Sequence, residues 1–219
     1  KTPLASITGY SQLLMDDLGS IPASEMVSRS VHAILTQGNK LATLVDKLLN
    51  FTVLEELKED DVTRDVVPVD KLLEDAQEAL KSWLEEHKGT VNAKPAPGLQ
   101  VHGDRRLLRD VFNNLIENGV KFAGDAREVD VWSEPSGPGV AIHFRDRGPG
   151  IPPEEQEKIF DRFYQIEASF TGQVDGWGLG LPFVKKVIET HGGRVKLDSA
   201  LGKGTTVTVW MPQDERPAA

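Results

Sequence analysis

Two glycine-rich turns and one carboxylate are the parts of this chain best suited to chemistry. The first turn, residues 146–151, opens with Asp146 and has glycines at 148 and 150. An aromatic segment follows at residues 160–164, and the second turn, residues 176–181, has glycines at 176, 178 and 180. Glycine lets a backbone turn sharply and approach a ligand closely. A glycine-rich turn that carries a carboxylate, followed by an aromatic segment and a second glycine-rich turn, is typical of a pocket that holds a nucleotide.

An asparagine-rich helix upstream offers a second kind of chemistry. Asn114 and Asn118 are four residues apart, so a helix places them on one face, and Lys121 follows about one turn later. The amide oxygen of Asn118 suits a hard cation such as Mg2+, which keeps several waters and bridges phosphates. Lys121 can meet the same phosphates as a point charge. The alternative for such a helix is polar surface or bonding to the local backbone.

Each glycine motif is weak when it is taken alone. The glycines at 176–180 are spaced one residue too tightly for a dinucleotide fingerprint, and they also fit a simple hinge. Residues 202–205 read Gly-Lys-Gly-Thr, but the first glycine of the phosphate-binding motif G-x-x-x-x-G-K is missing. The Asp-x-Gly-x-Gly sequence at 146–150 by itself also fits an ordinary tight turn.

Taken in order, these segments resemble the N, G1, F and G2 boxes of the sensor histidine kinases. The boxes correspond to residues 114–122, 146–151, 160–164 and 176–181. The resemblance extends over residues 1–212 and implies a kinase core that binds ATP together with Mg2+. The nucleotide site that it implies is formed by Asn114, Asn118 (also the metal ligand), Lys121, Phe122, Asp146, Gly148, Gly150, Ile151, Tyr164, Gly176, Gly178, Leu179, Gly180, Leu181 and Thr206.

The resemblance also implies which groups surround the base. Asp146 accepts a hydrogen bond from the adenine amino group, and the two glycines of its turn let the backbone approach the base. Phe122 packs near the nucleoside. A threonine of the last glycine box supports the adenine through water, and Thr206 is favoured over Thr205 for this role.

Asn114 distinguishes a kinase from a hydrolase within the related fold. In gyrase B, the heat-shock chaperone and the mismatch-repair proteins, the matching position is a glutamate that activates water. An amide cannot act as a general base at neutral pH, so we expect this site to hold ATP for another nucleophile. Asn114 is therefore both a binding and a catalytic candidate. Glu117 points about 100° away from Asn118 on a helix and is not the missing base.

Residues 152–175 resemble the lid that covers the phosphates in this family. Its phenylalanines are Phe160, Phe163 and Phe170. Their rings are expected to clasp one end of the lid or to close over it, although the first two also fit an ordinary core. Many relatives carry an arginine after the lid's Phe-Tyr pair, where this chain has Gln165. Arg162 and Lys185 are the candidates to replace it.

Residues 1–4 resemble the end of the phosphoacceptor box, in which His-Glu-x-Lys-Thr-Pro-Leu opens the first helix. The nucleophilic histidine is then expected three residues before Lys1, so the chain as printed should bind Mg-ATP without phosphorylating that histidine. Thr2 matches a threonine that orients water when relatives dephosphorylate their regulator, and its alternative is a simple polar residue. The histidines at 32, 87, 102, 143 and 191 are expected to be structural or solvated.

Residues 1–60 are expected to form an antiparallel helical hairpin for dimerisation and phosphotransfer. Apolar residues recur at three- and four-residue spacing, with Ser11 and Gly38 each taking one position of the stripe. The break between the helices is expected at 19–22, with Ser24 as the N-cap of the second helix. Two helices cannot bury both apolar stripes, so we expect a homodimer that forms a four-helix bundle.

A second domain is expected over residues 66–212, after an acidic boundary at 55–65. The pattern predicts strands at 66–69, 129–133, 140–146, 194–199 and 205–211, helices at 72–84, 107–122 and 180–190, and a loop at 94–98. Strands and helices mixed in this way predict a sheet with helices on one face. The expected fold class is therefore α+β, with a helical hairpin followed by an α/β sandwich that binds ATP.

Composition limits the classes of function. The net charge is −9, with 25 basic and 34 acidic residues, which argues against a nucleic-acid partner. The chain has no cysteine, which fits a reducing cytoplasm, and no apolar run near the ~18 residues of a membrane span. Because the first residue is not Met, we expect a fragment of a longer bacterial protein. Its sensor domain and any membrane anchor would lie upstream.

The leading hypothesis is the core of a two-component sensor histidine kinase. In the intact protein, the γ-phosphate of ATP would pass to a histidine on the first helix and then to an aspartate of a response-regulator receiver domain. Two alternatives remain open. One is a dimeric scaffold that binds nucleotide without phosphoryl transfer, and the other is a hydrolytic ATPase of the related fold. The signal sensed, the cognate regulator and the choice between transfer within or between subunits are not set by the sequence.

Overall fold

The computed structural model describes residues 2–18, 25–56, 58, 61–166 and 177–213. The chain divides into two compact units, Lys1–Val53 and Leu54–Ala219. Within the described parts of the chain, no helix combines the length and the apolar character that crossing a bilayer requires.

The first unit is built from two helices, α1 (Thr2–Leu18) and α2 (Glu25–Glu56). The expected break at 19–22 and the expected N-cap Ser24 lie outside the described residues. Gly38 is buried, and a Cβ atom there would come within 2.9 Å of Thr8 Cγ2. The two helices therefore approach closely at this point, which explains why the apolar stripe of α2 carries a glycine.

Much of the apolar stripe is exposed. Ser11 and Val31 are buried. Among the side chains of these helices that the structure describes, the large apolar ones that stay exposed are Ile7, Tyr10, Leu13, Leu14, Val27, Ile34 and Leu41. Exposed large apolar side chains in this number on two helices favour a surface that meets a partner. The two helices thus present a face suited to a further helical partner.

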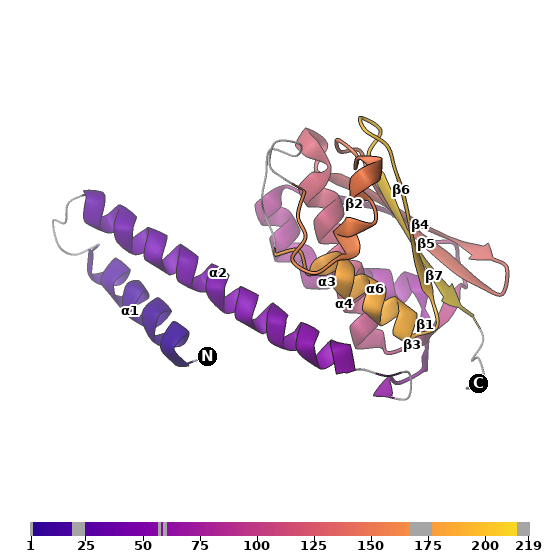
Figure 1. The fold of residues 1–219 in the computed structure, drawn as a ribbon, viewed down its shortest axis with the longest axis horizontal. Coiled ribbons are helices and arrows are strands. Elements are labelled where there is room, and N and C mark those ends of the chain that lie inside the picture. Colours follow the sequence, from indigo (N-terminus) through magenta and orange to yellow (C-terminus); the bar gives the residue numbers. More distant parts are fainter. Residues whose placement is uncertain (1, 19–24, 57, 59–60, 167–176, 214–219) are drawn as a thin grey trace. The chain divides into compact units, whose positions relative to one another are not determined.

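The second unit contains a five-stranded sheet (Figure 1) with the strand order β2-β4-β5-β7-β6. Its strands are β2 (Thr90–Lys94), β4 (Glu128–Ser136), β5 (Gly139–Asp146), β6 (Arg194–Ser199) and β7 (Thr205–Pro212). β2 runs parallel to β4, and the other neighbouring strands are antiparallel. A separate antiparallel pair is formed by β1 (Asp65–Pro68) and β3 (Gln100–Gly103).

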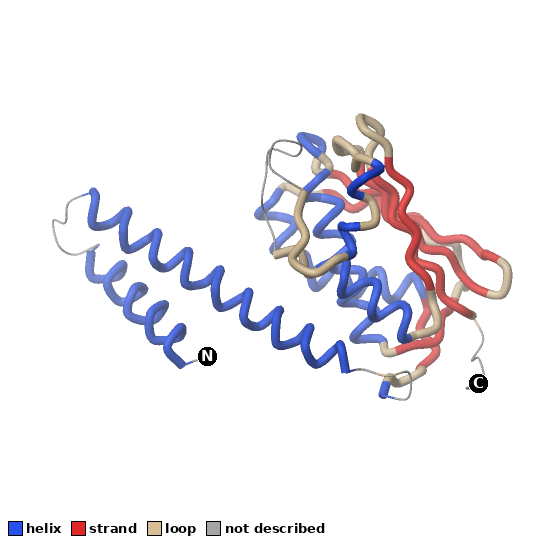
Figure 2. Tube along the Cα trace, in the orientation of Figure 1, coloured by secondary structure: helices blue, strands red, loops and turns tan. Residues whose placement is uncertain are grey.

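Three helices lie on one face of this sheet, as Figure 2 shows: α3 (Val69–His87), α4 (Arg105–Phe122) and α6 (Gly180–Thr190). Their apolar residues form one core with the inward residues of the strands, among them Leu72, Phe112, Ile142 and Val209. Buried and half-buried residues alternate along β7, as expected for a sheet with one covered face. The predicted fold class, a helical region followed by an α/β sandwich, is confirmed.

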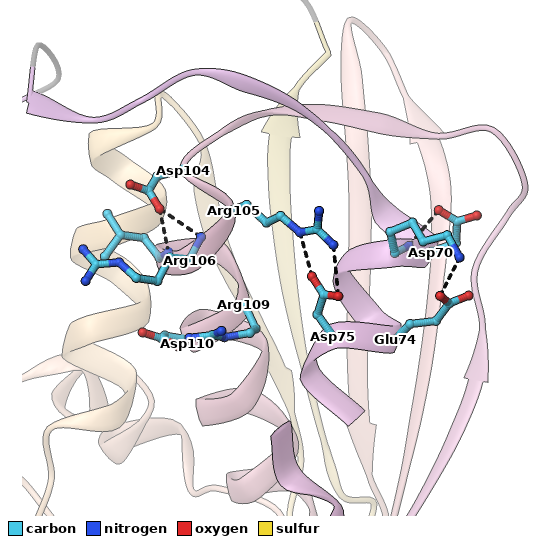
Figure 3. Close-up of polar contacts among 10 residues, drawn as sticks. Asp70, Glu74, Asp75, Asp104, Arg105, Arg106, Arg109 and Asp110 are labelled. Atoms are coloured by element: carbon cyan, nitrogen blue, oxygen red, sulfur yellow. Dashed lines mark hydrogen bonds and ion pairs between the residues drawn. The ribbon is translucent and has the colours of Figure 1, made fainter. Parts of the chain in front are cut away.

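Polar contacts fix the start of α4 and its position against α3 (Figure 3). The Asp104 carboxylate caps the helix, accepting hydrogen bonds from the N–H groups of Arg106 at 2.9 Å and Leu107 at 3.0 Å. The guanidinium of Arg105 donates to both oxygens of Asp75 on α3, at 2.7 and 3.0 Å. This hydrogen-bonded pairing lowers the pKa of Asp75. Together these contacts orient the helix that carries the asparagines.

A buried histidine joins the C-terminal end of α6 to the start of α4. His191 Nε2 accepts a hydrogen bond from the Asp104 N–H at 3.0 Å, so Nδ1 carries the proton and donates to the Val187 carbonyl at 2.7 Å. This pair of bonds requires the neutral ring, and burial lowers the pKa of His191. His191 is therefore a structural residue of the second unit.

The sequence pattern misses two strands, β2 and β3, between the predicted helices at 72–84 and 107–122. β2 is short and polar, and its partner β4 begins more than thirty residues later, with Thr90 opposite Glu128. β3 pairs with β1 across the whole of α3. Both strands depend on distant partners, which local periodicity cannot reveal.

Candidate functional site

Asp146 is the last residue of β5, and its side chain is buried. Its Oδ1 accepts hydrogen bonds from the N–H of Gly148 at 2.8 Å and from the N–H of Thr205 at 3.2 Å. Burial raises the pKa of Asp146, and these two backbone hydrogen bonds oppose the rise. Both bonds end on one oxygen, so the main chain fixes the orientation of the carboxylate.

Main-chain atoms enclose the turn that follows Asp146. A Cβ atom on Gly148 would lie 1.9 Å from the carbonyl oxygen of Phe122, the last residue of α4. Gly150 is enclosed in the same way, by the Ala200 carbonyl oxygen at 2.0 Å. The turn is therefore wedged between the end of α4 and the β6–β7 loop, and only glycine fits at 148 without backbone movement.

Ser199, at the end of β6, ties this turn to the start of β7. Its hydroxyl oxygen accepts from the Ile151 N–H at 2.9 Å and lies 2.8 Å from Thr205 Oγ1. The Gln156 amide donates to the carbonyl oxygens of Ile151 and Ser199, at 2.9 and 3.0 Å. Sequence reasoning missed Ser199 and Gln156, because their role comes from contacts between distant segments and neither residue belongs to a glycine motif.

The structure places Thr205, and not Thr206, beside the carboxylate. Successive residues of a strand point to opposite faces of the sheet. Thr205 is buried on the helix-covered face, whereas Thr206 pairs with the exposed Arg145 and points to the other face. The sequence-based preference for Thr206 does not fit this geometry, since the alternation along β7 turns its hydroxyl away from Asp146.

Asn114 and Asn118 meet at Gly180, the first residue of α6. A Cβ atom on Gly180 would lie 3.1 Å from Asn114 Oδ1, 3.4 Å from Asn118 Nδ2 and 3.9 Å from Asn118 Oδ1. The Asn114 amide nitrogen donates to the Asp110 carbonyl at 2.7 Å, so its oxygen is the atom presented to Gly180. Helical spacing on α4 thus brings two amides to the N-terminus of another helix.

Lys121 is on the same helix, but its ammonium is directed toward α3. Nζ lies 3.7 Å from Glu117 Oε2 and 5.6 Å from the centroid of the Trp83 ring. Phe122, the next residue, is 37% exposed. Sequence reasoning placed Lys121 on the asparagine face and missed Trp83, because the contact crosses between two helices.

Two residues of the expected lid, Phe163 and Tyr164, contact Gly178, which follows the lid. The Phe163 N–H donates to the Gly178 carbonyl at 3.0 Å, and a Cβ atom on Gly178 would meet the Tyr164 carbonyl oxygen at 2.6 Å. Gly178 has a φ of +64° and Phe163 a φ of +60°, a conformation that a bulky residue rarely adopts. Gly178 is thus required at this junction both by its φ and by the space available.

The remaining predicted residues are spread over several elements. The Tyr164 hydroxyl donates to Glu155 of the short helix η3 (Pro153–Glu155), which raises the pKa of Tyr164. Lys185 Nζ lies 5.8 Å from the centroid of the Phe160 ring. Leu179 is buried, and Leu181 packs against the core. Thr2 is the first residue of α1, and Gly176 and Phe170 lie outside the described residues.

The donors around Gly180 fit a hard cation. The described part of the chain contains no group of three or more His, Asp or Glu side chains that could hold a metal. The amide oxygens of Asn114 and Asn118 are neutral ligands that suit Mg2+, an ion that usually takes few protein ligands and keeps waters and phosphates around it. A cation bound by these two amides would keep most of its coordination positions for other ligands.

Two protein families match the chain. Residues 103–215 match the family described as Histidine kinase-, DNA gyrase B-, and HSP90-like ATPase. Residues 1–57 match the His Kinase A (phospho-acceptor) domain.

Individual relatives resemble the chain over most of its length. Sensor protein SrrB of Staphylococcus aureus (strain N315) is 27% identical over 215 residues, which are 98% of this chain and 36% of SrrB. Full-length ShkA, solved in complex with AMPPNP, is 25% identical, with a TM-score of 0.75 over 100% of this chain and 44% of its own. Mycobacterial sensor histidine kinase MprB is 27% identical, with a TM-score of 0.59 over 68% of this chain and 97% of its own. This chain spans about a third of the length of SrrB.

Proposed function

Because this chain belongs to the family of histidine kinase-, DNA gyrase B- and HSP90-like ATPases and forms a histidine kinase core, we propose that it binds ATP and donates the γ-phosphoryl group to a histidine. In the intact protein, the phosphoryl group then passes to an aspartate of a response-regulator receiver domain. One observation supports this most strongly. Helix α4 contacts Gly180 through its asparagines and Gly148 through its last residue, so it connects an amide pair with the buried Asp146.

Asp146 is the proposed base-recognition group. Its Oδ1 is occupied by the N–H groups of Gly148 and Thr205, so we assign Oδ2 to the adenine amino group. A hydrogen bond to a buried carboxylate is strong, because the surroundings have a low dielectric constant. Guanine carries a carbonyl oxygen at the same ring position, which would face the carboxylate. The site should therefore select ATP over GTP.

The asparagine pair and the N-terminus of α6 form the proposed phosphate end. Asn118 is the proposed ligand of Mg2+, which when bound would supply positive charge that bridges the phosphates. At the start of α6, the N–H groups of Gly180 and Leu181 can donate to phosphate oxygens, whereas Pro182 has no N–H. Asn114 cannot take a proton from water. The site should therefore hold ATP for a histidine and not hydrolyse it.

The first unit supports the proposed partners. We propose that the exposed apolar stripe of α1 and α2 pairs with a second copy to form a four-helix bundle. Thr2, at the start of α1, is the proposed residue that orients water during dephosphorylation of the regulator. We further propose that the core acts in the cytoplasm, with a sensor domain upstream.

Two measurements test the function. Calorimetry should detect Mg-dependent binding of ATP to the chain as printed. A chain extended upstream to include the histidine expected three residues before Lys1 should acquire label from γ-labelled ATP, on a histidine. Binding without label would indicate a nucleotide-binding scaffold, and steady phosphate release without labelled protein would indicate a hydrolase. Either result would contradict the proposed kinase activity.

A further inference from the structure

We propose that Trp83 and Glu117 hold the Lys121 ammonium away from the phosphate end in the nucleotide-free protein, and that ATP draws it across. Trp83 is then a positioning residue that lowers ATP affinity by competing for Lys121. This inference rests on the proposed function and on the phosphate contact that the sequence predicts for Lys121.

The backbone of α4 places Lys121 between two destinations. At about 100° per residue, Lys121 lies about 20° from Asn114 and about 60° from Asn118 around the helix. Glu117 lies about 40° from Lys121 on the other side. A long lysine side chain on that line can direct its ammonium either to the amide pair or to Glu117.

In the structure, the ammonium is on the Glu117 side. It lies 3.7 Å from Glu117 Oε2 and 5.6 Å from the Trp83 ring centroid, within the range of a cation–π contact. The side chains of Lys121 and Glu117 are only 19% and 24% exposed. Partial removal from water strengthens both interactions, because water screens them less. The lysine therefore has a favourable position that does not involve a ligand.

Trp83 is itself held in place. Its ring stacks on His87 with centroids 4.1 Å apart and an interplanar angle of 18°, and His87 Nδ1 lies 2.9 Å from the Trp83 carbonyl oxygen. Arg127 donates to the His87 carbonyl at 2.8 Å, and the indole packs against the core of the second unit. A fixed ring gives the ammonium a defined alternative to the phosphates.

The competition between the phosphates and the Trp83 and Glu117 contacts for Lys121 should lower ATP affinity. Moving the ammonium to the phosphates requires breaking its contacts with Trp83 and Glu117, so those contacts weaken ATP binding. Loss of one partly exposed cation–π contact corresponds to about a two- to fivefold change in Kd. Adenosine has no phosphate for Lys121 to meet. Its affinity should therefore be independent of Trp83.

Calorimetric titration of four chains with Mg-ATP and with adenosine tests this: wild type, Trp83→Leu, Lys121→Met and the double variant. We expect Trp83→Leu to tighten Mg-ATP about two- to fivefold and to leave adenosine unchanged. In the Lys121→Met background, the same change at 83 should have no effect on either ligand. Trp83→Phe keeps an aromatic ring in the core and should tighten Mg-ATP less than Trp83→Leu, since Trp is the strongest cation–π partner. Thermal melts of each variant check that the fold is intact.

Three results would overturn the inference, and they can be told apart. If Lys121→Met weakens Mg-ATP but neither change at Trp83 alters it, Lys121 meets the phosphates without competition, and the proposed function stands. If changes at Trp83 shift Mg-ATP and adenosine equally, Trp83 acts through packing alone. If Lys121→Met leaves Mg-ATP affinity unchanged, Lys121 has no phosphate role, and the sequence-based prediction for Lys121 fails as well, whereas the proposed function stands.

Discussion

The two ends of the proposed nucleotide site are made of different atoms. Around Asp146 the walls are main chain: the Phe122 carbonyl lies against Gly148, and the Ala200 carbonyl lies against Gly150. Around Gly180 the walls are the side-chain amides of Asn114 and Asn118. Main-chain walls move only if whole elements move, whereas side chains change rotamer within a close-packed interior.

This difference assigns different tasks to the two ends. The proposed base end is enclosed by main-chain atoms, so we expect it to discriminate one purine from another. The phosphate end is adjustable, because its groups have alternative partners, such as Glu117 and Trp83 for Lys121. Substitutions that add atoms should therefore be far more harmful at the base end than at the phosphate end.

Gly148→Ala should give the largest effect. Its Cβ atom would lie 1.9 Å from the Phe122 carbonyl oxygen, so the turn or the end of α4 must shift. We expect a loss of about 3 kcal/mol or more in the free energy of unfolding, together with loss of ATP binding, measured by denaturant titration and calorimetry. Gly202→Ala is the matched control in the adjacent loop. Apart from the residues next to it in the chain, nothing in the described structure lies within 4 Å of its added Cβ. Its φ is +73°, so it should lose only about 1–2 kcal/mol. Equal losses in the two variants would contradict the claim that main-chain atoms exclude a Cβ atom at residue 148.

Asp146→Asn should separate binding from stability. The amide can still accept from Gly148 and Thr205, but its NH2 group cannot accept from adenine. We expect ATP affinity to fall about 10- to 100-fold, the scale of a hydrogen bond to a charged group. The pKa of Asp146 is raised in the fold, so its charged form opposes folding above that pKa, and the neutral amide should leave the melting temperature at pH 7 unchanged or higher. Unchanged ATP affinity would refute the base assignment.

Gly180→Ala should change the stability of the fold little but should weaken Mg-ATP binding. The added Cβ would lie 3.1 Å from Asn114 Oδ1 and 3.4 Å from Asn118 Nδ2, and both amides can rotate. Because alanine favours a helix, stability should stay within about 1 kcal/mol of wild type. Displacing the amides should weaken Mg-ATP about tenfold and adenosine little, in calorimetry with and without Mg2+. If adenosine weakened equally, the two ends would not be separate.

Low pH should lower the free energy of unfolding of the second unit through His191. The pKa of His191 is lowered in the fold by burial, so the unfolded chain binds its proton more readily. The neutral His191 ring therefore stabilises the fold fully above the unfolded pKa of about 6.5. This stabilisation is lost as the pH falls below that value, because the unfolded chain then binds a proton. Between pH 7 and pH 5.5 we expect a decrease of about 1 kcal/mol that is absent in His191→Gln, from urea titrations at each pH. A parallel pH dependence in both chains would contradict this assignment.

Local sequence signals predicted the residues that the fold brings together at Gly180. Helical spacing placed Asn114 and Asn118 on one face, and the glycine at 180 marks a close approach. The strands at 129–133 and 140–146 were also readable, because their alternation is clear; the structure extends them to Glu128–Ser136 and Gly139–Asp146. These features need only the periodicity of one element.

The features that the sequence missed all depend on two distant segments. Ser199 joins the turn after β5 to the start of β7. Trp83 lies on α3 and contacts the ammonium of Lys121 on α4. The choice between Thr205 and Thr206 depended on which face of β7 meets Asp146, which is set by the register with β5. No periodicity within a single element contains that information.

A crystal structure of the chain with an ATP analogue and Mg2+ tests the central claim most directly. We predict the adenine amino group within hydrogen-bonding distance of Asp146 Oδ2, with the Mg2+ ion bound to the Asn118 oxygen and to phosphate oxygens. The turn at 146–150 should be unchanged, and Lys121 should have left Trp83 for the phosphates. An adenine bound elsewhere in the chain, or a nucleotide at this site without contact to Asp146, would contradict the account.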